Sequence, residues 1–227
     1  MKTTLYIVAT PIGNLEDITL RAIRVLKEAD VILCEDTRMT KRLLDKYEIR
    51  AKTLSYNAHS TQAKNKEIFE LLEEGKTLAL VSDAGTPGIS DPGMLLVRQV
   101  REHFRDEVAV VPIPGASALS AALSASGAPS SEFLFLGFLP HKKGRETLFK
   151  EIAASKRTVV FYESPHRIMK TLGSLAKYAG DRRIIIAREL TKIHEEFPAG
   201  TPTEVTEYFT THKDKVRGEF VVIVEPK

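Results

Sequence analysis

The sequence is poor in cysteine, since Cys34 is the only one among its 227 residues. A single thiol excludes a framework of intrachain disulfides and is typical of proteins that work in a reducing compartment. Long apolar runs are missing too, and none approaches the ~20 residues that a membrane-spanning helix needs. The N-terminal "MKTTLYIVAT" continues into a strand pattern without the apolar core and cleavage site of a secretion signal. We therefore expect a cytoplasmic protein with no membrane partner.

Sequence signatures of several common enzyme classes are absent. "ATPIGN" carries a single glycine, so a dinucleotide-binding GxGxxG is missing, and no GxxxxGK(S/T) phosphate loop occurs. HExxH and paired CxxC motifs are absent and the six histidines are scattered, which argues against a metal site. No GxSxG nucleophile elbow is present either. A site without an obvious nucleophile or metal favours a cofactor that brings its own reactivity.

Charge of neither sign predominates, because 33 Lys and Arg face 30 Asp and Glu, a formal net charge of +3. This excess is only a weak indication of a polyanionic partner, since many enzymes carry as much. Hydrophobic residues at 43% and charged residues at 28% are ordinary for a globular protein. The length suffices for one large domain or two small ones with a buried core.

Short apolar runs alternate with helical patterns in the first half of the chain. The segments "DITLRAIRVLKEA" and "KEIFELLEE" place apolar residues at helical spacing. Strands separated by helices predict a mainly parallel α/β sheet. The expected strands are 4–9, 31–34, 53–56, 77–81 and 108–113.

The second half has the same two kinds of element in a different arrangement. We expect helices near 145–154 and 166–178, and "TPTE" (201–204) is a capping box with proline at the first helical position, so a helix should begin there. A bend near 127–132 separates the halves. The expected strands are 133–138, 158–163, 183–189 and 219–225. We therefore expect two α/β lobes with a ligand at strand ends that face the cleft between them.

Loops shaped by glycine and proline follow four strands of the first half. In a parallel sheet these loops lie at one edge, so they should converge on one pocket, although each alone could be a simple strand–helix turn. Glycine allows positive φ and close ligand approach, and proline restricts the backbone. The small residues of "PGASALSAALSASG" would let a helix N-terminus approach an anion or a carboxylate. The loops are 9–14, 34–38, 82–93 and 113–118.

Six motifs resemble one enzyme family in order and spacing: "VATPIGNLEDITLRA", "EDTRMTKRLL", "SDAGTPGISDPG", "PIPGASA", "FYESPHR" and "ARELTKIHEEF". Over residues 5–225 the chain is similar to the ribosomal small-subunit RNA 2'-O-ribose methyltransferase I family of the tetrapyrrole-methylase superfamily. The resemblance implies a two-lobed class III methyltransferase fold, with a mainly parallel N-terminal sheet and a mixed C-terminal sheet. It implies S-adenosylmethionine as cofactor, bound in a cleft between lobes 1–115 and 116–227. The C-terminal extension common in the family is not found after "VEPK".

The resemblance assigns cofactor binding to loop residues of both lobes. It places Ala116 and Ser117 at the methionine end and the second-lobe residues around the adenosine. Asp83 also has the simpler interpretation of a turn former after a strand. The complete set is Pro11, Asp83, Ala84, Gly85, Ile89, Ser90, Ala116, Ser117, Tyr162, Pro165 and Leu190.

The acceptor that the resemblance implies is the ribose 2'-hydroxyl of a decoding-site cytidine. A hydroxyl with a high pKa needs a base, or a charge that stabilises the alkoxide. Glu35, Asp36 and Lys192 are the catalytic candidates, and a local ion pair or helix cap is the alternative for residues 35–38.

Cations and polar groups near the expected cleft are candidates for RNA contacts, because RNA binding uses phosphate-seeking cations and groups that hold a splayed base. Each cluster alone is more often a solvated face. The candidates are Arg38, Lys41, Arg42, Asn57, His59, Lys142, Lys143 and Arg145.

Two other functions compete with RNA methylation. One is methylation of a corrinoid or porphyrin carbon, and the other is non-catalytic binding of a nucleotide or RNA. The expected partner is small-subunit rRNA in the assembled or nearly assembled 30S subunit, since a site between lobes suits a flipped-out nucleotide. The resemblance also suggests a homodimer.

Overall fold

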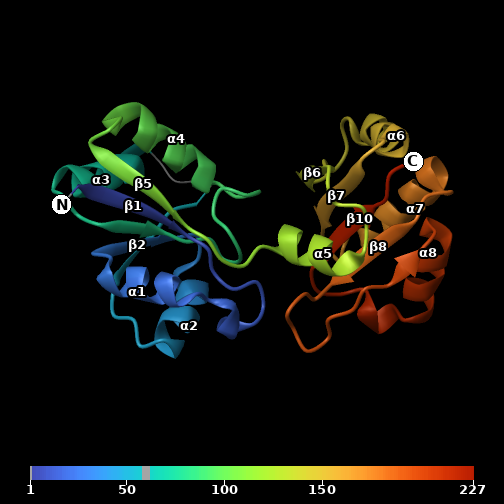
Figure 1. The fold of residues 1–227 in the computed structure, drawn as a ribbon, viewed down its shortest axis with the longest axis horizontal. Coiled ribbons are helices and arrows are strands. Elements are labelled where there is room, and N and C mark those ends of the chain that lie inside the picture. Colours follow the sequence, from blue (N-terminus) through green and yellow to red (C-terminus); the bar gives the residue numbers. More distant parts are fainter. Residues whose placement is uncertain (1, 58–61) are drawn as a thin grey trace. The chain divides into compact units, whose positions relative to one another are not determined.

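The computed structural model describes residues 2–57 and 62–227. The chain divides into two compact units, Met1–Ser117 and Ala118–Lys227, both drawn in Figure 1. The bend at 127–132 lies inside the second unit, where it joins a helix to a strand. Within the described residues, none of the helices is long and apolar enough to cross a membrane.

The first unit is built on a five-stranded sheet in the order β3-β2-β4-β1-β5. Every pairing in it is parallel, as the alternation of strands and helices predicts. The inner strands β2 and β4 are buried throughout and read as continuous apolar runs, as in a parallel sheet covered on both faces. They are β1 (Thr3–Val8), β2 (Val31–Cys34), β3 (Lys52–Ser55), β4 (Leu78–Leu80) and β5 (Val108–Ile113).

Helices cover both faces of this sheet (Figure 1). Ile32 and Cys34 of β2 share a buried cluster with residues of α1 and α2, whereas the alternate residues Val31 and Leu33 pack with α3 and α4. This division follows from the opposite directions of successive side chains along a strand. The helices are α1 (Leu20–Glu28), α2 (Thr37–Lys46), α3 (Gln62–Glu73) and α4 (Gly93–Phe104), and a 3-10 turn (Leu15–Asp17) precedes α1.

The second unit holds a mixed sheet in the order β6-β7-β10-β8-β9. The β6–β7 pair is parallel and the other three pairs are antiparallel, which confirms the expected mixed sheet. The sequence gives no sign of β9, which is only two residues long. The strands are β6 (Phe133–Phe138), β7 (Thr158–Glu163), β8 (Ile184–Arg188), β9 (Ala199–Gly200) and β10 (Phe220–Val224).

Three helices of the second unit share its buried core with one face of the sheet, and a fourth contacts β8 and β10. The three are α6 (Arg145–Ala154), α7 (Ile168–Ala179) and α8 (Pro202–Thr211), and the fourth is α5 (Ala118–Ser126). The predicted start of α8 is confirmed. The Thr201 hydroxyl accepts a hydrogen bond from the Glu204 backbone N–H, and the Glu204 carboxylate accepts one from the Thr201 N–H.

Replacing the capping residue should therefore destabilise α8. We expect Thr201→Ala to lower the free energy of unfolding by ~1 kcal/mol, because a helix N–H loses its acceptor. Thermal unfolding of the full chain measures the change. Thr203→Ala, in the first turn of the same helix, is the matched control and should be neutral or slightly stabilising, since alanine has the highest helix propensity. Equal losses in both variants would contradict a capping role.

Candidate active site

The loops after β1 and β4 are hydrogen-bonded to each other. The Thr10 N–H donates to the Gly85 carbonyl at 2.9 Å, and the Gly85 N–H donates to the Thr10 carbonyl at 3.0 Å. The Thr10 hydroxyl adds a bond to the Ser82 carbonyl at 3.1 Å. These contacts form a short antiparallel bridge beyond the carboxyl ends of two parallel strands.

The loops after β2 and β5 are hydrogen-bonded to the loop after β4. The Asp36 N–H donates to Asp83 Oδ1 at 3.0 Å, which links the β2 loop to the β4 loop. The Thr86 hydroxyl donates to the Ala116 carbonyl at 3.1 Å, which links the β4 loop to the β5 loop. The predicted convergence of the four loops at one sheet edge is confirmed.

The loop 82–93 is shaped by its own contacts. Gly85 and Gly88 have φ of 82° and 86°, in the left-handed region that favours glycine, and Ser90 has φ of 65°. The Asp91 carboxylate accepts hydrogen bonds from the backbone N–H groups of Gly88 at 2.8 Å and Gly93 at 2.7 Å. The form of the loop is therefore set in part by its own hydrogen bonds.

The first-unit residues that the resemblance assigns to the cofactor lie on these loops. Pro11 and Gly85 are buried, Ala116 and Ser117 are half-buried, and the others are exposed. A Cβ on Gly85 would lie 3.3 Å from Ile12 Cγ2, so a side chain here would be crowded as well as strained by the positive φ. Backbone groups and short side chains form this edge of the sheet, which suits a ligand held by main-chain contacts. These first-unit residues thus fit S-adenosylmethionine, the cofactor that the resemblance implies.

The second-unit residues of the set lie on its own sheet and the following loops. Tyr162, on β7, packs edge-on against Phe135 and Phe138, with ring centroids 5.0 and 5.5 Å away. Burial raises the pKa of Tyr162, although a hydrogen bond with the Leu119 backbone acts in the opposite direction. Pro165 is half-buried, whereas Leu190 is buried.

Glu35 has the electrostatic surroundings of a candidate base. Glu35 is the residue directly after β2, and it is half-buried. Burial raises the pKa of Glu35, and repulsion from the carboxylates of Asp83 and Asp91 raises it further, against a hydrogen bond from the Asp83 backbone. A carboxylate with a raised pKa is a stronger base than an exposed glutamate. Glu35 therefore remains a catalytic candidate.

Asp36 is instead the N-cap of α2. Its Oδ1 accepts the Arg38 backbone N–H at 2.8 Å, and its Oδ2 lies 2.7 Å from Arg38 Nη2. Hydrogen bonds from the Arg38 side chain and backbone lower the pKa of Asp36 to about 2. Such a carboxylate is a poor proton acceptor at neutral pH. The interpretation of Asp36 as a base is therefore corrected to that of a helix cap paired with Arg38.

Lys192 is also unsuited to accept a proton. Its Nζ donates to Glu189 Oε1 at 2.9 Å and to Glu219 Oε2 at 3.0 Å. Burial disfavours its charged form, but these hydrogen bonds outweigh burial and raise the pKa of Lys192. The protonated amine can act only through its positive charge, so the candidate role that survives is stabilisation of an alkoxide.

The candidate RNA-contact residues differ in their exposure to solvent. Lys142 and Lys143 are exposed in the turn before α6. On α2, Lys41 pairs with Asp45 at 2.8 Å, and Arg42 is exposed. Asn57 is half-buried. His59 lies outside the described residues.

Arg145 is not an exposed cation. It is 8% exposed, and its Nη2 donates to the Thr171 hydroxyl at 2.7 Å. Its Nη1 donates to the Pro140 carbonyl at 3.1 Å, and Nη2 lies 3.8 Å from Glu163 Oε2. The assignment of Arg145 as a direct RNA contact is therefore corrected, because its guanidinium is committed to partners inside the second unit.

Sequence reasoning missed two carboxylates that organise these segments. Asp91 shapes the β4 loop, and the "DPG" turn that contains it was the available signal. Glu163 pairs with Arg167 at 2.7 Å, and their spacing of four residues was the signal for that pair.

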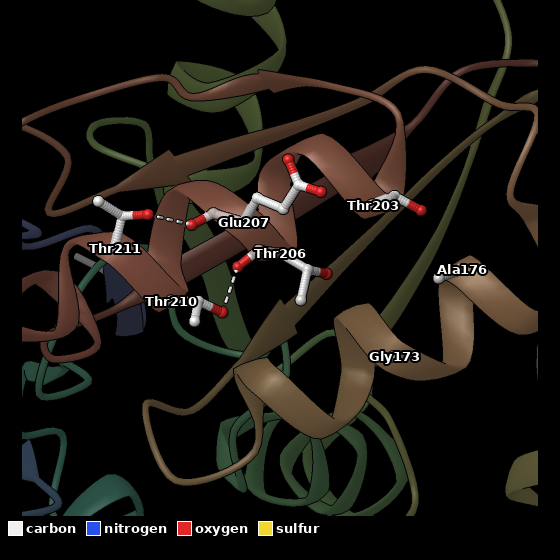
Figure 2. Close-up of a pocket in the computed structure, with 7 residues that line it drawn as sticks. All are labelled: Gly173, Ala176, Thr203, Thr206, Glu207, Thr210 and Thr211. Atoms are coloured by element: carbon white, nitrogen blue, oxygen red, sulfur yellow. Dashed lines mark hydrogen bonds between the residues drawn. The ribbon is translucent and has the colours of Figure 1, made fainter.

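A groove of about 270 Å³ lies between α7 and α8, apart from every candidate residue (Figure 2). The hydroxyls of Thr206, Thr210 and Thr211 donate to carbonyls four residues earlier in α8, so they are already satisfied. The described residues contain no cluster of His, Cys, Asp or Glu side chains that could hold a metal ion. The groove is lined by Gly173, Ala176, Thr203, Thr206, Glu207, Thr210 and Thr211.

The fold is that of known methyltransferases. Residues 4–206 match the family model described as tetrapyrrole (corrin/porphyrin) methylases. Cobalt precorrin-4 methyltransferase superposes with a TM-score of 0.69 at 20% identity, covering 98% of this chain and 95% of that one. Uroporphyrin-III C-methyltransferase from Thermus thermophilus, complexed with S-adenyl homocysteine, superposes with a TM-score of 0.66 at 20% identity. The superposition covers 98% of this chain and 97% of that one. The fold and the converging loops thus define a tetrapyrrole-methylase-type methyltransferase.

Relatives with similar sequences identify the family within this class of methyltransferases. Ribosomal RNA small subunit methyltransferase I of Thermotoga maritima is 48% identical over 98% of this chain and 98% of that protein. The protein of the same name from Halalkalibacterium halodurans is 50% identical over 99% of this chain and 76% of that protein. The chain belongs to the ribosomal RNA small subunit methyltransferase I family of the tetrapyrrole methylases. It is a methyltransferase whose cofactor is S-adenosylmethionine, as the motifs predicted.

Proposed function

We propose that the chain methylates the ribose 2'-hydroxyl of a decoding-site cytidine in small-subunit (16S) rRNA. The observation that carries this proposal is the set of hydrogen bonds that bring the loops after β1, β2, β4 and β5 together. This edge holds a shaped backbone loop beside Glu35, which has a raised pKa, and so combines a ligand cradle with a base. The 48% identity to an rRNA methyltransferase over almost the whole chain supports the RNA substrate.

In this proposal the protein acts mainly by positioning. S-adenosylmethionine supplies a methyl group that its sulfonium has already activated. The loop 82–93, with Pro11, Ala116 and Ser117, holds the cofactor in the first unit, and Tyr162, Pro165 and Leu190 contribute from the second. Alignment of donor and acceptor is worth ~7–11 kcal/mol in favourable cases.

Glu35 is the proposed base for the 2'-hydroxyl. Its carboxylate would take the hydroxyl proton while the ribose oxygen bonds to the methyl carbon and the methyl–sulfur bond breaks, with S-adenosylhomocysteine as the leaving group. The Lys192 ammonium would stabilise negative charge on the ribose oxygen. Lys142 and Lys143, with Arg38, Lys41 and Arg42 of α2, bind RNA phosphates in this proposal. Asn57 is a further proposed RNA contact, and so is His59, which lies outside the described residues.

Removing charge from the turn before α6 should weaken RNA binding. For Lys142→Gln combined with Lys143→Gln, we expect the slope of log affinity against log salt to fall by about 0.7 for each lost phosphate contact. Filter binding of small-subunit RNA over a salt series measures the slope. Lys156 is an exposed lysine near the other end of α6. Lys156→Gln is therefore the control for the loss of one lysine charge outside the turn. An unchanged slope in the double variant would remove this turn from the RNA surface.

The proposed reaction is tested by transfer of a labelled methyl group to small ribosomal subunits that lack the modification. We expect the label in a 2'-O-methylcytidine of the decoding site, mapped by nuclease digestion. Naked rRNA in parallel tests the proposal that the substrate is the assembled or nearly assembled 30S subunit. Sedimentation of the active enzyme tests the proposed homodimer.

The same assay separates the competing functions. Methylation of uroporphyrinogen without transfer to RNA would replace our proposal with a porphyrin methylase. Cofactor binding without turnover on any ribosomal particle would support a non-catalytic binding protein.

A further inference from the structure

A buried carboxylate lies at the end of β7. The Glu163 side chain is 0% exposed, and its Oε1 lies 2.7 Å from Arg167 Nη2. Its Oε2 accepts the Thr171 hydroxyl at 2.6 Å and lies 3.8 Å from Arg145 Nη2. Its Oε1 also accepts the Ser164 backbone N–H at 2.8 Å. One carboxylate thus holds two arginines and the start of the following loop.

Both arginines reach from this carboxylate to the segment after β6. Arg167 Nη1 donates to the Leu139 carbonyl at 2.8 Å, and Arg145 Nη1 donates to the Pro140 carbonyl at 3.1 Å. These consecutive carbonyls lead directly into the turn that carries the exposed Lys142 and Lys143. The base of that turn is therefore hydrogen-bonded to the buried cluster.

Arg145 makes contacts that only a guanidinium can make together. Its two terminal nitrogens bond the Pro140 carbonyl and the Thr171 hydroxyl, and its centre lies 5.0 Å from the Phe149 ring centroid. The planar guanidinium presents donors in a fixed fork, whereas lysine has a single ammonium. Gly144, directly before Arg145, has φ of 78°, a left-handed conformation that favours glycine at the entry to α6.

We propose that Arg145, held by Glu163 and Thr171, is a positioning residue that presents Lys142 and Lys143 to the phosphates of the RNA substrate. The proposal rests on the proposed function and deepens it. Holding the backbone of a cationic turn before binding lowers the entropy that association would otherwise cost. The same carboxylate holds Ser164, between Tyr162 and Pro165, so the cofactor segment and the RNA turn of this unit share one support.

The test is Arg145→Lys in the full-length enzyme, assayed for methyl transfer to small ribosomal subunits. We expect the KM for subunits to rise about five- to twentyfold, because the turn is no longer pre-organised. The turnover number and the Kd for S-adenosylmethionine should stay within about twofold, because Glu163 keeps its bond to Ser164. A smaller salt slope should accompany the higher KM.

A matched control comes from another buried arginine of the unit. Arg182 is 4% exposed and donates to the Ile152 carbonyl, outside the 139–144 segment. Arg182→Lys should lower the thermal midpoint without a change in KM. Thr171→Val, which removes the bridging hydroxyl with little change of shape, should raise KM in the same direction as Arg145→Lys, and Thr171→Ser should restore it. These variants decide the question if Arg145→Lys does not fold.

A combined variant separates positioning from general destabilisation. Once Lys142 and Lys143 are glutamines, Arg145→Lys should raise KM no further, because the cations that it positions are gone. Additive effects, or a normal KM in both Arg145→Lys and Thr171→Val, would overturn the positioning role while leaving RNA methylation intact. Failure of the wild-type enzyme to label RNA would instead overturn the proposed function itself.

Discussion

Glu35→Gln should slow single-turnover methyl transfer to small ribosomal subunits by about 10²–10⁴-fold, the usual contribution of a general base. Glutamine has nearly the same size and can still accept the hydrogen bond that Glu35 receives from the Asp83 backbone. The link between the β2 and β4 loops should therefore persist, and with it cofactor affinity. Rapid quenching with labelled S-adenosylmethionine measures the rate, and equilibrium dialysis measures the affinity.

The pH dependence of the wild-type rate gives a second signature. Only the ionised carboxylate accepts a proton, so the rate should fall as pH decreases through the pKa of Glu35. Burial and repulsion from Asp83 and Asp91 raise that pKa, so the decline should begin at higher pH than for an exposed glutamate. Glu35→Gln should lose this limb of the profile, because it removes the titrating group.

Asp36→Asn is the matched control, since it makes the same change of carboxylate to amide one residue later. The pKa of Asp36 is about 2 because its oxygens are engaged by Arg38. Asparagine is also a good N-cap, so α2 should keep its start. We expect a rate close to that of the wild type. A normal rate in Glu35→Gln, or equal losses in both variants, would exclude Glu35 as the base.

The fold was predictable because short stretches of the sequence carry the signals for its strands and turns. The inner parallel strands β2 and β4 are buried along their whole length, so they appear in the sequence as short continuous apolar runs. The turn residues between these runs then identify the loops, and parallel topology alone requires that loops after the strands share one edge. The β9 strand escaped prediction because two residues carry no periodicity.

The roles of charged residues were less predictable because they depend on distant partners. Arg145, Lys142 and Lys143 form one basic stretch in the sequence, yet only Arg145 is buried. The difference comes from Glu163 and Thr171, and Thr171 lies 26 residues further along the chain. Similarly, Glu219, one of the two carboxylates that hold Lys192, lies 27 residues further along the chain, whereas Glu189 is only three residues away. Neither of the two distant partners, Thr171 and Glu219, has a signal within a short window.

Glu163→Ala should have the largest effect on stability. Its side chain is fully buried and is the shared partner of two arginines that are themselves largely buried. Removing it leaves two guanidinium groups without their counter-charge in a site with little water. Breaking a buried ion pair in this way typically costs ~3–5 kcal/mol. Denaturant unfolding followed by circular dichroism measures the loss in the free energy of unfolding.

The comparison of variants identifies the cause of that loss. Glu146→Ala removes an exposed carboxylate that pairs with Lys150 at 3.1 Å, and should leave stability nearly unchanged. Glu163→Gln keeps the shape and an acceptor for Thr171 but not the charge, so its loss should be intermediate. If Glu163→Gln is as stable as the wild type, hydrogen bonding rather than charge holds the cluster. If Glu163→Ala is also stable, water replaces the carboxylate between the arginines, and the turn before α6 does not depend on it.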